Sequence, residues 1–357
     1  MSKKPLILGI ESSCDETAAS LITENEEGFP VVLSNIVSSQ VEVHKEFGGV
    51  VPELAARSHI EKIDWIVKKA IDESGRKIEE IDAVASTAGP GLIVCLSVGL
   101  SFGKAFATAM NKPFIAVNHL EGHALSPKLN SNLNYPYLLL LISGGHSQYL
   151  SVQNLGKYKR LGTTIDDALG EAFDKTAKLL GIEFPGGPQI EILAKKGDPE
   201  KYDLPKPIFS KGGCNLSFAG LKTAVLKISK TIKSDQDKYD LAASFQKTIE
   251  EILYKKTKIA FTEFEKINKL NEKIFVVAGG VAANKKIRSM LINLCEENNY
   301  KSIFPPIEFC GDNAAMIAMV GLEKFKINQF NNLDYPAKPR WPLDEDAAFL
   351  KGAGVQL

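Results

Sequence analysis

The chain has 357 residues, of which 44% are hydrophobic and 24% charged, as in folded water-soluble proteins, and it is too long for most single cores. Lysine and arginine together number 43, as do aspartate and glutamate, so any nucleic-acid partner would have to bind a local basic patch. No apolar run has the length of a membrane span and the N-terminus lacks a signal-peptide core, which predicts a cytoplasmic protein without a membrane partner.

The cysteines are widely scattered and are never spaced as Cys-x-x-Cys. This pattern argues against a disulfide framework and against a thiolate zinc site, and it suits a reducing compartment. The residues concerned are Cys14, Cys95, Cys214, Cys295 and Cys310.

An antiparallel meander is predicted at the start of the chain. Residues 6–10, 17–22 and 30–37 are apolar runs of strand length. The turn between the first two runs carries Asp15 and Glu16. These are either solvated turn residues or groups presented to a ligand phosphate or its metal.

Helices and strands then alternate. Residues 52–71 have apolar side chains at three- and four-residue steps, which predicts a helix. Residues 81–86 read as a buried strand, and residues 97–109 as a helix whose many small side chains we interpret as close packing. Residues 114–117 form the next predicted strand.

That strand leads directly into a pair of histidines, His119 and His123. Residues four apart lie on one face of a helix, close enough for two imidazoles to hold one metal ion. A pair of helix-capping or interface histidines fits the same pattern, so the pattern alone leaves both interpretations open. The position after the carboxyl end of a strand is the usual place for a site in α/β sheets.

A second strand-turn-strand unit starts after an asparagine-rich loop. Strands are predicted at residues 137–142 and 149–152, joined by the turn of residues 143–147. The resemblance to the opening hairpin indicates a weak internal repeat and the start of a second lobe. The two glycines of this turn allow backbone N–H groups to approach an anion, although they also suit an ordinary hairpin.

The second lobe is predicted to be rich in helices. Residues 166–180 form an amphipathic helix that carries Asp174, and residues 185–188 form a rigid loop that could lie against a sugar or base. Residues 197–214 look like a surface insertion. The lysines within this insertion and directly after it form the best local basic patch of the chain. The patch is either a solvated face or a nucleic-acid contact. The lysines are Lys201, Lys206, Lys211, Lys222, Lys227, Lys230 and Lys233.

Two glycine-containing turns complete the pattern. A long helix at residues 239–267 precedes a strand at residues 274–278, which enters residues 279–284 and a further helix. Strand, glycine pair and helix N-terminus together are a recurrent arrangement on the nucleotide side of a site. Asp312 opens the last small-residue helix, where it is by default an N-cap and is also the most plausible third metal ligand.

Taken together, seven collinear motifs resemble the tRNA N(6)-adenosine threonylcarbamoyltransferase family, TsaD in bacteria, formerly known as O-sialoglycoprotein endopeptidase. The resemblance implies the α/β actin/Hsp70/sugar-kinase fold, with two lobes, each a mixed sheet flanked by helices, and the ligand between them. The lobes expected are residues 1–133 with about 311–357, and residues 134–310. The motifs lie at residues 10–17, 118–123, 142–146, 170–175, 185–188, 279–284 and 311–315.

The family's reaction is the transfer of threonylcarbamoyl from threonylcarbamoyl-AMP to the exocyclic amine of the adenosine beside the anticodon, in tRNAs reading codons that begin with A. By resemblance, His119, His123 and Asp312 are ligands of a divalent metal, iron first and zinc second. Asp15 or Glu16 would assist removal of the proton from the amine. The donor would be bound by Ile142, Ser143, Gly144, Gly145 and His146, and its ribose and adenine by Asp174, Gly187 and Asn284.

Bacterial members act with a paralogue, TsaB, and an ATPase, TsaE, so similar partners are expected. The leading alternative is a metal-dependent glycoprotein endopeptidase. Its catalytic glutamate would directly follow the first histidine or precede the second, whereas Glu121 lies two positions from each, roughly 200° away around the helix. A non-catalytic nucleotide-binding scaffold is the other alternative.

Overall fold

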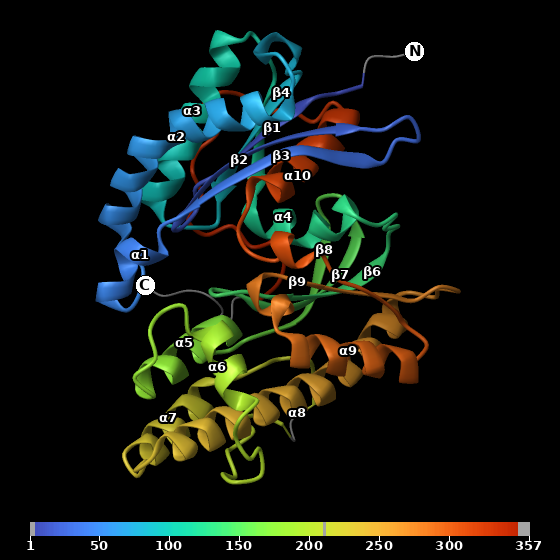
Figure 1. Ribbon diagram of the computed structural model, residues 1–357. Helices are drawn as coiled ribbons and strands as arrows, with labels where there is room; N and C mark the ends of the chain where they lie inside the picture. The colour runs from blue at the N-terminus through green and yellow to red at the C-terminus, as the bar shows by residue number, and fades with distance from the viewer. Residues whose placement is uncertain (1–3, 210–211, 349–357) are drawn as a thin grey trace. The chain divides into compact units, whose positions relative to one another are not determined.

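The computed structural model describes residues 4–209 and 212–348 and divides into two compact units (Figure 1). The first unit comprises the described residues up to Leu133 together with Pro305–Glu345, and the second comprises the described residues of the range 134–304 and those from Asp346. Each unit contains one five-stranded mixed sheet with helices packed against it. The predicted fold class of two mixed sheets flanked by helices is therefore confirmed.

In the first sheet the strand order is β3-β2-β1-β4-β5. The first three strands form the predicted antiparallel meander, and β4 and β5 run parallel to β1. The carboxyl ends of β1, β4 and β5 therefore lie at one edge of the sheet. The strands are β1 (Ile7–Glu11), β2 (Glu16–Glu24), β3 (Pro30–Ser39), β4 (Ala83–Gly89) and β5 (Phe114–Asn118).

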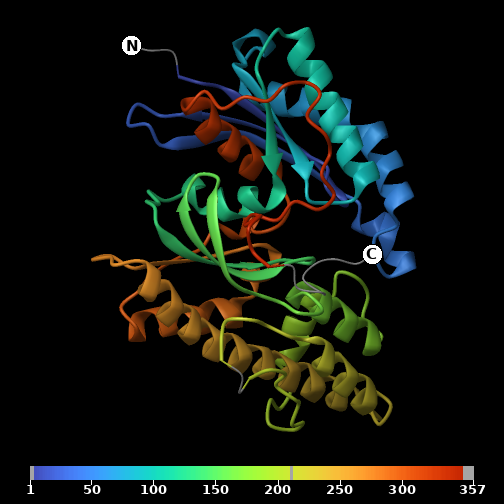
Figure 2. The same ribbon diagram turned by 180° about the vertical axis from the view of Figure 1, so that it is seen from behind.

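Helices cover both faces of this sheet, with α2 and α3 on one side and α10 on the other (Figures 1 and 2). Small residues allow the close contacts on each face. A Cβ atom at Gly9 would lie 2.5 Å from the carbonyl oxygen of Ala314 in α10, and one at Gly99 in α3 would lie 2.2 Å from Ser12 Oγ. The packing interpretation of the small residues in α3 is thus confirmed. The helices are α1 (Val41–His44), α2 (Pro52–Ser74), α3 (Ile93–Ala109), α4 (His119–Leu125) and α10 (Ala314–Lys326), with short 3-10 turns at Lys45–Phe47, Ile78–Glu80, Ser126–Leu129 and Ile307–Phe309.

The second sheet has the order β10-β9-β6-β7-β8. Read from β8, this repeats the order and the strand directions of the first sheet, so the internal repeat inferred from the two hairpins extends to whole sheets. Two of its strands, β8 and β10, were not predicted from the sequence. The strands are β6 (Tyr137–Ile142), β7 (Ser147–Asn154), β8 (Lys157–Thr163), β9 (Ile274–Ala278) and β10 (Lys301–Ile303).

Five α-helices are described in the second unit, and three predictions there need correction. The helix predicted from residue 166 begins at Leu169, because Asp166 accepts hydrogen bonds from the backbone N–H groups of Phe218 and Ala219. Residues 186–188, predicted as a loop, form the first turn of α6. The long helix begins at Asp235, with Ser234 as its N-cap. The helices are α5 (Leu169–Leu179), α6 (Gly186–Ala194), α7 (Ala219–Ser229), α8 (Asp235–Ile267) and α9 (Lys285–Glu297), with a 3-10 turn at Gly280–Ala283.

None of the described helices is both long enough and apolar enough to cross a membrane.

Candidate metal centre and nucleotide-binding turns

The two histidines lie where β5 ends and α4 begins. The side chain of Asn118 accepts a hydrogen bond from the backbone N–H of Leu120 at 2.9 Å, which caps the helix and starts it immediately after the strand. His119 and His123 therefore occupy one face of the first turns of α4, and both are buried. Their position at the carboxyl edge of the sheet agrees with the prediction.

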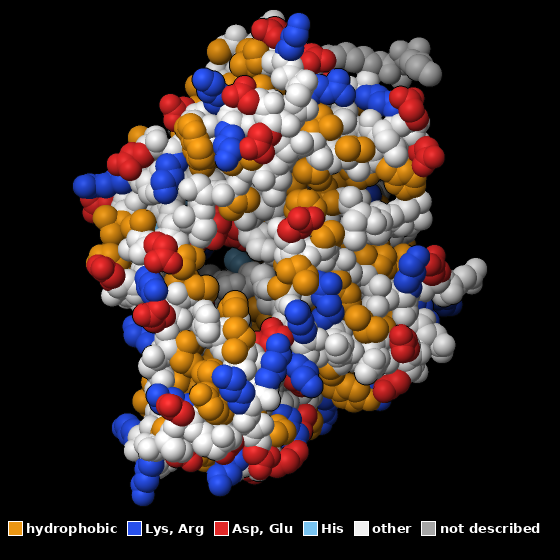
Figure 3. All heavy atoms as spheres, viewed as in Figure 1, with side chains coloured by type: hydrophobic (Ala, Val, Ile, Leu, Met, Phe, Trp, Pro, Cys, Tyr) orange, Lys and Arg blue, Asp and Glu red, His pale blue; other side chains and the backbone are white. Residues whose placement is uncertain are grey.

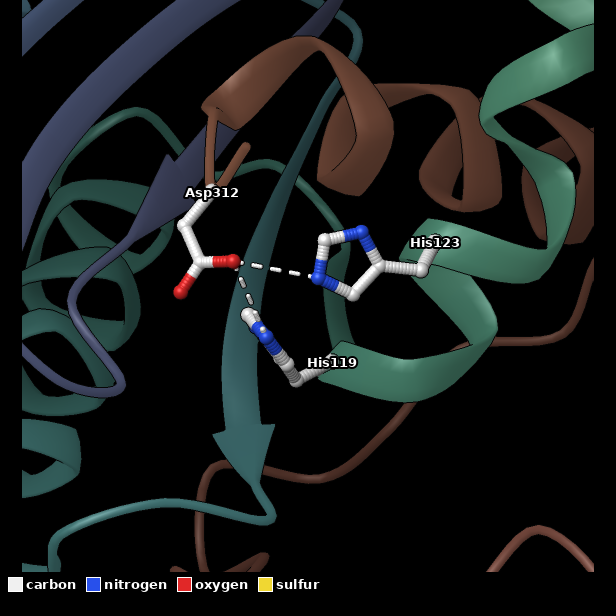
Figure 4. A group of neighbouring side chains, drawn as sticks. All are labelled: His119, His123 and Asp312. Atoms are coloured by element: carbon white, nitrogen blue, oxygen red, sulfur yellow. Dashed lines mark hydrogen bonds and ion pairs between the residues drawn. The ribbon is translucent and has the colours of Figure 1, made fainter. Parts of the chain in front are cut away.

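Asp312 lies against both imidazoles (Figure 4). Its Oδ1 atom is 3.0 Å from His123 Nε2 and 3.5 Å from His119 Nε2. The three candidate ligand atoms lie within 4.8 Å of one another. The structure thus brings together the three residues selected from the sequence as metal ligands.

The default interpretation of Asp312 as a helix cap is wrong. The N-cap of α10 is the next residue, Asn313, whose side chain accepts a hydrogen bond from the backbone N–H of Met316 at 3.0 Å. Because Asn313 satisfies the helix end, the carboxylate of Asp312 is left to face the histidines.

Glu11, at the end of β1, is a residue of the centre that the sequence analysis did not select. Its Oε2 atom is 3.0 Å from His119 Nδ1 and accepts a hydrogen bond from Thr87 Oγ1 at 2.6 Å, and its Oε1 atom accepts one from the backbone N–H of Ser13 at 2.5 Å. A carboxylate can only accept, so His119 donates to Glu11 through Nδ1–H, and Nε2 is the ring nitrogen that faces Asp312 and would bind a cation. The signal that could have revealed Glu11 is an acidic residue ending an otherwise apolar strand.

The ionisable side chains of this centre shift one another's pKa values. Burial alone would lower the pKa of His119, but the carboxylates of Asp312 and Glu11 outweigh it and raise that pKa well above its ordinary value. Burial alone would likewise raise the pKa of Asp312, but His119 and then His123 hold it well below its usual range. Two carboxylates therefore favour positive charge between them, and a divalent cation would supply the same charge.

The donor set fits a metal ion. Two imidazoles and one carboxylate leave coordination positions open, as Lewis-acid sites require. His123 presents Nε2 to Asp312, while its Nδ1 atom is buried without a hydrogen-bond partner among the described residues. The group is thus compatible with a metal ion, and its geometry does not select which one.

The two predicted acidic groups of the first hairpin differ in exposure. Asp15 is buried, whereas Glu16 is half-buried at the start of β2. Burial, followed by the carboxylates of Asp312 and Asp15, raises the pKa of Glu16 well above its ordinary value. Glu16 therefore stays protonated to a higher pH than an ordinary glutamate.

A third histidine fixes the turn that carries these groups. His59 in α2 lies 3.0 Å from the carbonyl oxygen of Cys14 through Nε2 and 2.7 Å from Thr17 Oγ1 through Nδ1. The carbonyl can only accept, so Nε2–H donates to Cys14 and Nδ1 accepts from the Thr17 hydroxyl. Burial, and then Asp15, raises the pKa of the Cys14 thiol well above its ordinary value, so Cys14 is not a reactive thiolate.

In the second unit, the predicted nucleotide-binding turns meet at one edge of the sheet. β6 and β9 are parallel neighbours, with Leu141 opposite Ala278, so the turns that follow them are adjacent. Gly279 has a φ of +95°, and a Cβ atom there would lie 2.4 Å from the carbonyl oxygen of Ile142. By contrast, a Cβ atom at Gly144 or Gly145 would meet nothing within 4 Å.

The turn of residues 143–146 is well ordered by its own hydrogen bonds. The backbone N–H of Ser143 donates to the carbonyl oxygen of His146 at 2.8 Å, and the backbone N–H of His146 donates to Ser143 Oγ at 3.2 Å. Gly170, just inside α5, packs on this turn, since its N–H donates to the carbonyl oxygen of Ser143 at 3.1 Å. The exposed glycines Gly144 and Gly145 therefore sit on a fixed backbone.

Asp174, Gly187 and Asn284 lie on helices around these turns. Asp174 Oδ1 accepts a hydrogen bond from the backbone N–H of Gly186 at 2.7 Å, which supports the N-terminus of α6 next to Gly187. Asn284 is the N-cap of α9, and its side chain accepts from the backbone N–H of Ile287 at 3.0 Å. Both polar side chains thus already have structural partners.

The geometry around Glu121 disfavours a protease. Glu121 is buried and forms an ion pair with Lys324 Nζ at 2.9 Å. Lys324 belongs to α10, and the carboxylate therefore faces that helix instead of a water on the histidines. A metallopeptidase needs its glutamate at the metal-bound water.

Comparisons with known proteins agree with this geometry. The family model described as "TsaD: tRNA N6-adenosine threonylcarbamoyltransferase" matches residues 31–319. The tRNA N6-adenosine threonylcarbamoyltransferase of Pelagibacter ubique (strain HTCC1062) is 81% identical over 100% of both chains. That of Rickettsia conorii (strain ATCC VR-613 / Malish 7) is 54% identical over 95% of this chain and 98% of its own.

Among solved structures, HypF of T. kodakarensis is similar with a TM-score of 0.61 and 14% identity. The similarity covers 93% of this chain and 49% of HypF, so this chain spans about half of that larger protein. At this identity the similarity supports the fold alone.

Proposed function

The chain belongs to the tRNA N6-adenosine threonylcarbamoyltransferase family, and from this premise we propose that it transfers threonylcarbamoyl from threonylcarbamoyl-AMP to the amine of the adenosine beside the anticodon, in tRNAs reading codons that begin with A. The single observation that carries the mechanism is the His119, His123 and Asp312 group at the carboxyl edge of the first sheet. In the reaction, the amine nitrogen forms a bond to the carbamoyl carbon. The bond from that carbon to the AMP oxygen breaks, and AMP leaves.

His119, His123 and Asp312 would hold the metal, with Glu11 fixing the orientation of the His119 ring. When bound, the metal supplies a Lewis acid that stabilises negative charge on an oxygen of the donor. Two imidazoles and a carboxylate are typical of non-haem iron, so iron is proposed ahead of zinc. Metal analysis of purified protein distinguishes the two.

The second unit is proposed to bind the donor. The turn of residues 142–146 would wrap the adenylate and threonylcarbamoyl groups, since the open space at its exposed glycines, Gly144 and Gly145, admits a ligand against the main chain. Asp174, Gly187 and Asn284 would contact its ribose and adenine. The expectation that the ligand lies between the two lobes stays a prediction.

Proton removal from the attacking amine is proposed to involve the acidic pair of the first hairpin. Either carboxylate, Asp15 or Glu16, would accept the proton when it is ionised, and the raised pKa of Glu16 would confine its role to the higher part of the pH range. The pair is tested by comparing Asp15→Asn with Glu16→Gln in single-turnover reactions at saturating tRNA. The variant with the larger loss of rate identifies the acceptor, and wild-type rates in both variants would refute the role of the pair.

Partner proteins similar to TsaB and TsaE are proposed from the family resemblance, and a cytoplasmic location from the tRNA substrate. The first unit exposes large apolar side chains on the neighbouring helices α2 and α3, where a protein partner is proposed to bind. They are Ile60, Trp65, Ile93 and Val94. Copurification of the chain with each candidate partner tests this, and wild-type activity of the chain alone would contradict an obligatory partner.

The decisive experiment mixes the protein, with and without the two partners, with threonylcarbamoyl-AMP and unmodified tRNA. The tRNA is then digested and its nucleosides are weighed by mass spectrometry. Threonylcarbamoyladenosine that depends on the protein supports the proposal. Its absence under every combination, with metal-loaded and correctly folded protein, would overturn it.

A further inference from the structure

One stretch of the second unit is unusually basic. Residues 204–234 contain no aspartate or glutamate, although the whole chain has as many acidic as basic residues. The stretch contains six lysines, of which Lys211 lies outside the described residues and Lys206 forms an ion pair with Glu251. The other four are Lys222, Lys227, Lys230 and Lys233, on or just after α7.

These four lysines, named here the α7 lysine face, point away from the core. α7 buries Leu221 and Val225, which lie about 40° apart around the helix. Lys227 and Lys230 are exposed on the opposite side, Lys222 lies at the border, and Lys233 is exposed in the loop that follows. Figure 3 shows lysine and arginine side chains at the lower left of the view, where Figure 1 draws α7.

Neighbouring carboxylates do not neutralise this face. The acidic residues that follow begin α8, where Asp235 forms an ion pair with Lys238 at 3.3 Å and Asp237 accepts hydrogen bonds from the backbone of residues 233 and 234. Across the ranges 4–209 and 212–348, no ion pair with a carboxylate joins any of the four lysines. The positive charge is therefore available to a ligand.

A structural explanation for some of this charge exists. Lysines near a helix C-terminus stabilise the helix dipole, and Lys227 and Lys230 lie in and just after the last turn of α7. That effect falls off within one turn, so it does not account for Lys222 in the first turn or for Lys233. It also gives no reason for the absence of acidic residues from the whole stretch.

We propose that the α7 lysine face binds the phosphate backbone of the substrate tRNA. This inference rests on the proposed function, which makes a polyanion the substrate. Lysine ammonium groups bind phosphates as point charges without reading bases, so the face would position tRNA and leave the choice of nucleotide to the reaction centre. Large aromatic side chains, which stack on unpaired bases, are missing from α7 itself (Ala219–Ser229).

The test compares full-length proteins, together with their partners, in binding unmodified tRNA over a range of salt concentrations. In the variant Lys227→Ala/Lys230→Ala/Lys233→Ala, affinity at moderate salt should fall about tenfold or more, and the slope of log Kd against log salt should decrease by about 2 to 3. The KM for tRNA should rise while kcat at saturating tRNA stays unchanged. Arginine at the same three positions should restore binding.

The matched control removes three other exposed lysines of the same unit, Lys258, Lys266 and Lys269, at the far end of α8 and just after it. Equal tRNA affinity and salt slope in the α7 variant and the control would overturn the inference. So would a loss of thermal stability in the α7 variant without a loss of affinity, which is the outcome expected from a helix-dipole role. The wild-type protein could also form no threonylcarbamoyladenosine while the wild type and the control bind tRNA tightly and the α7 variant binds it weakly. In that case the proposed function fails and the surface assignment stands.

Discussion

Replacing Glu11 with glutamine tests the carboxylate that orients His119. Glutamine has nearly the same shape, and with its amide oxygen at the Oε1 position it still accepts from the backbone N–H of Ser13. The Thr87 hydroxyl can then turn to accept from the amide NH2 group at the Oε2 position, so the fold should persist. The variant then presents a neutral group, or an amide donor, at 3.0 Å from His119 Nδ1. An amide donor there would favour the tautomer with its proton on Nε2, which blocks metal binding.

The expected loss can be estimated from the geometry. Partners of metal-bound histidines typically contribute about 10- to 100-fold to metal affinity, which corresponds to about 1.4 to 2.7 kcal/mol. Glu11 is buried, with 1% of its surface exposed, so the upper half of that range is expected. The assay is competition for Zn²⁺ or Fe²⁺ with a chromophoric chelator, followed by metal analysis of the dialysed protein.

A matched control is Glu323→Gln, which removes another ion-paired carboxylate of the first unit, bonded to Lys128 at 2.7 Å and not to the histidines. This control should lose some stability and keep wild-type metal affinity. Wild-type metal affinity in Glu11→Gln, combined with loss of binding in His123→Ala, would refute the orienting role of Glu11.

Three further substitutions distinguish residues needed for the reaction from residues needed for the fold. His123→Ala should lose the metal and the threonylcarbamoyladenosine product while partners still copurify, and full product formation would contradict the metal's role. Gly99→Ala should lower the free energy of unfolding by about 1–3 kcal/mol in denaturant titrations, because the new Cβ atom would lie 2.2 Å from Ser12 Oγ. Gly144→Ala meets no atom within 4 Å, so it should leave the melting temperature unchanged and weaken binding of a non-hydrolysable threonylcarbamoyl-AMP analogue, measured by calorimetry. Unchanged binding would place the donor elsewhere.

Local sequence patterns predicted most of the strands and helices whose apolar residues recur at regular spacing. The apolar runs gave β1, β6 and β9, and the spacing of His119 and His123 gave one helix face. Asp312 could be selected from its place at a helix start and from the family resemblance. Aspartate and asparagine are both good N-cap residues, and the sequence does not show which of the two caps α10. In the structure Asn313 is the N-cap, so the side chain of Asp312 does not cap the helix.

Other features depend on contacts distant in sequence. β8 is a sheet edge whose residues 157 and 159 are exposed lysines, so its pattern reads as a polar loop, and β10 has only three residues. Asp166 looks like part of an amphipathic helix until the segment before α7 supplies its hydrogen-bond donors. Glu11 reads as the first polar residue of a turn, since neither Thr87 nor His119 is near it in sequence.

The placement of α10 has a consequence for biosynthesis. This helix packs on β1, β2 and β4 of the first unit, and Asp312 immediately precedes it with Asn313, yet both follow the whole of the second unit in the chain. A ribosome-bound chain that ends before residue 305 therefore lacks a covering layer for one face of its first sheet and one of the three candidate metal ligands. Because domains otherwise fold in order as they emerge, the first unit must wait, and metal loading is expected to be a late, largely post-translational step.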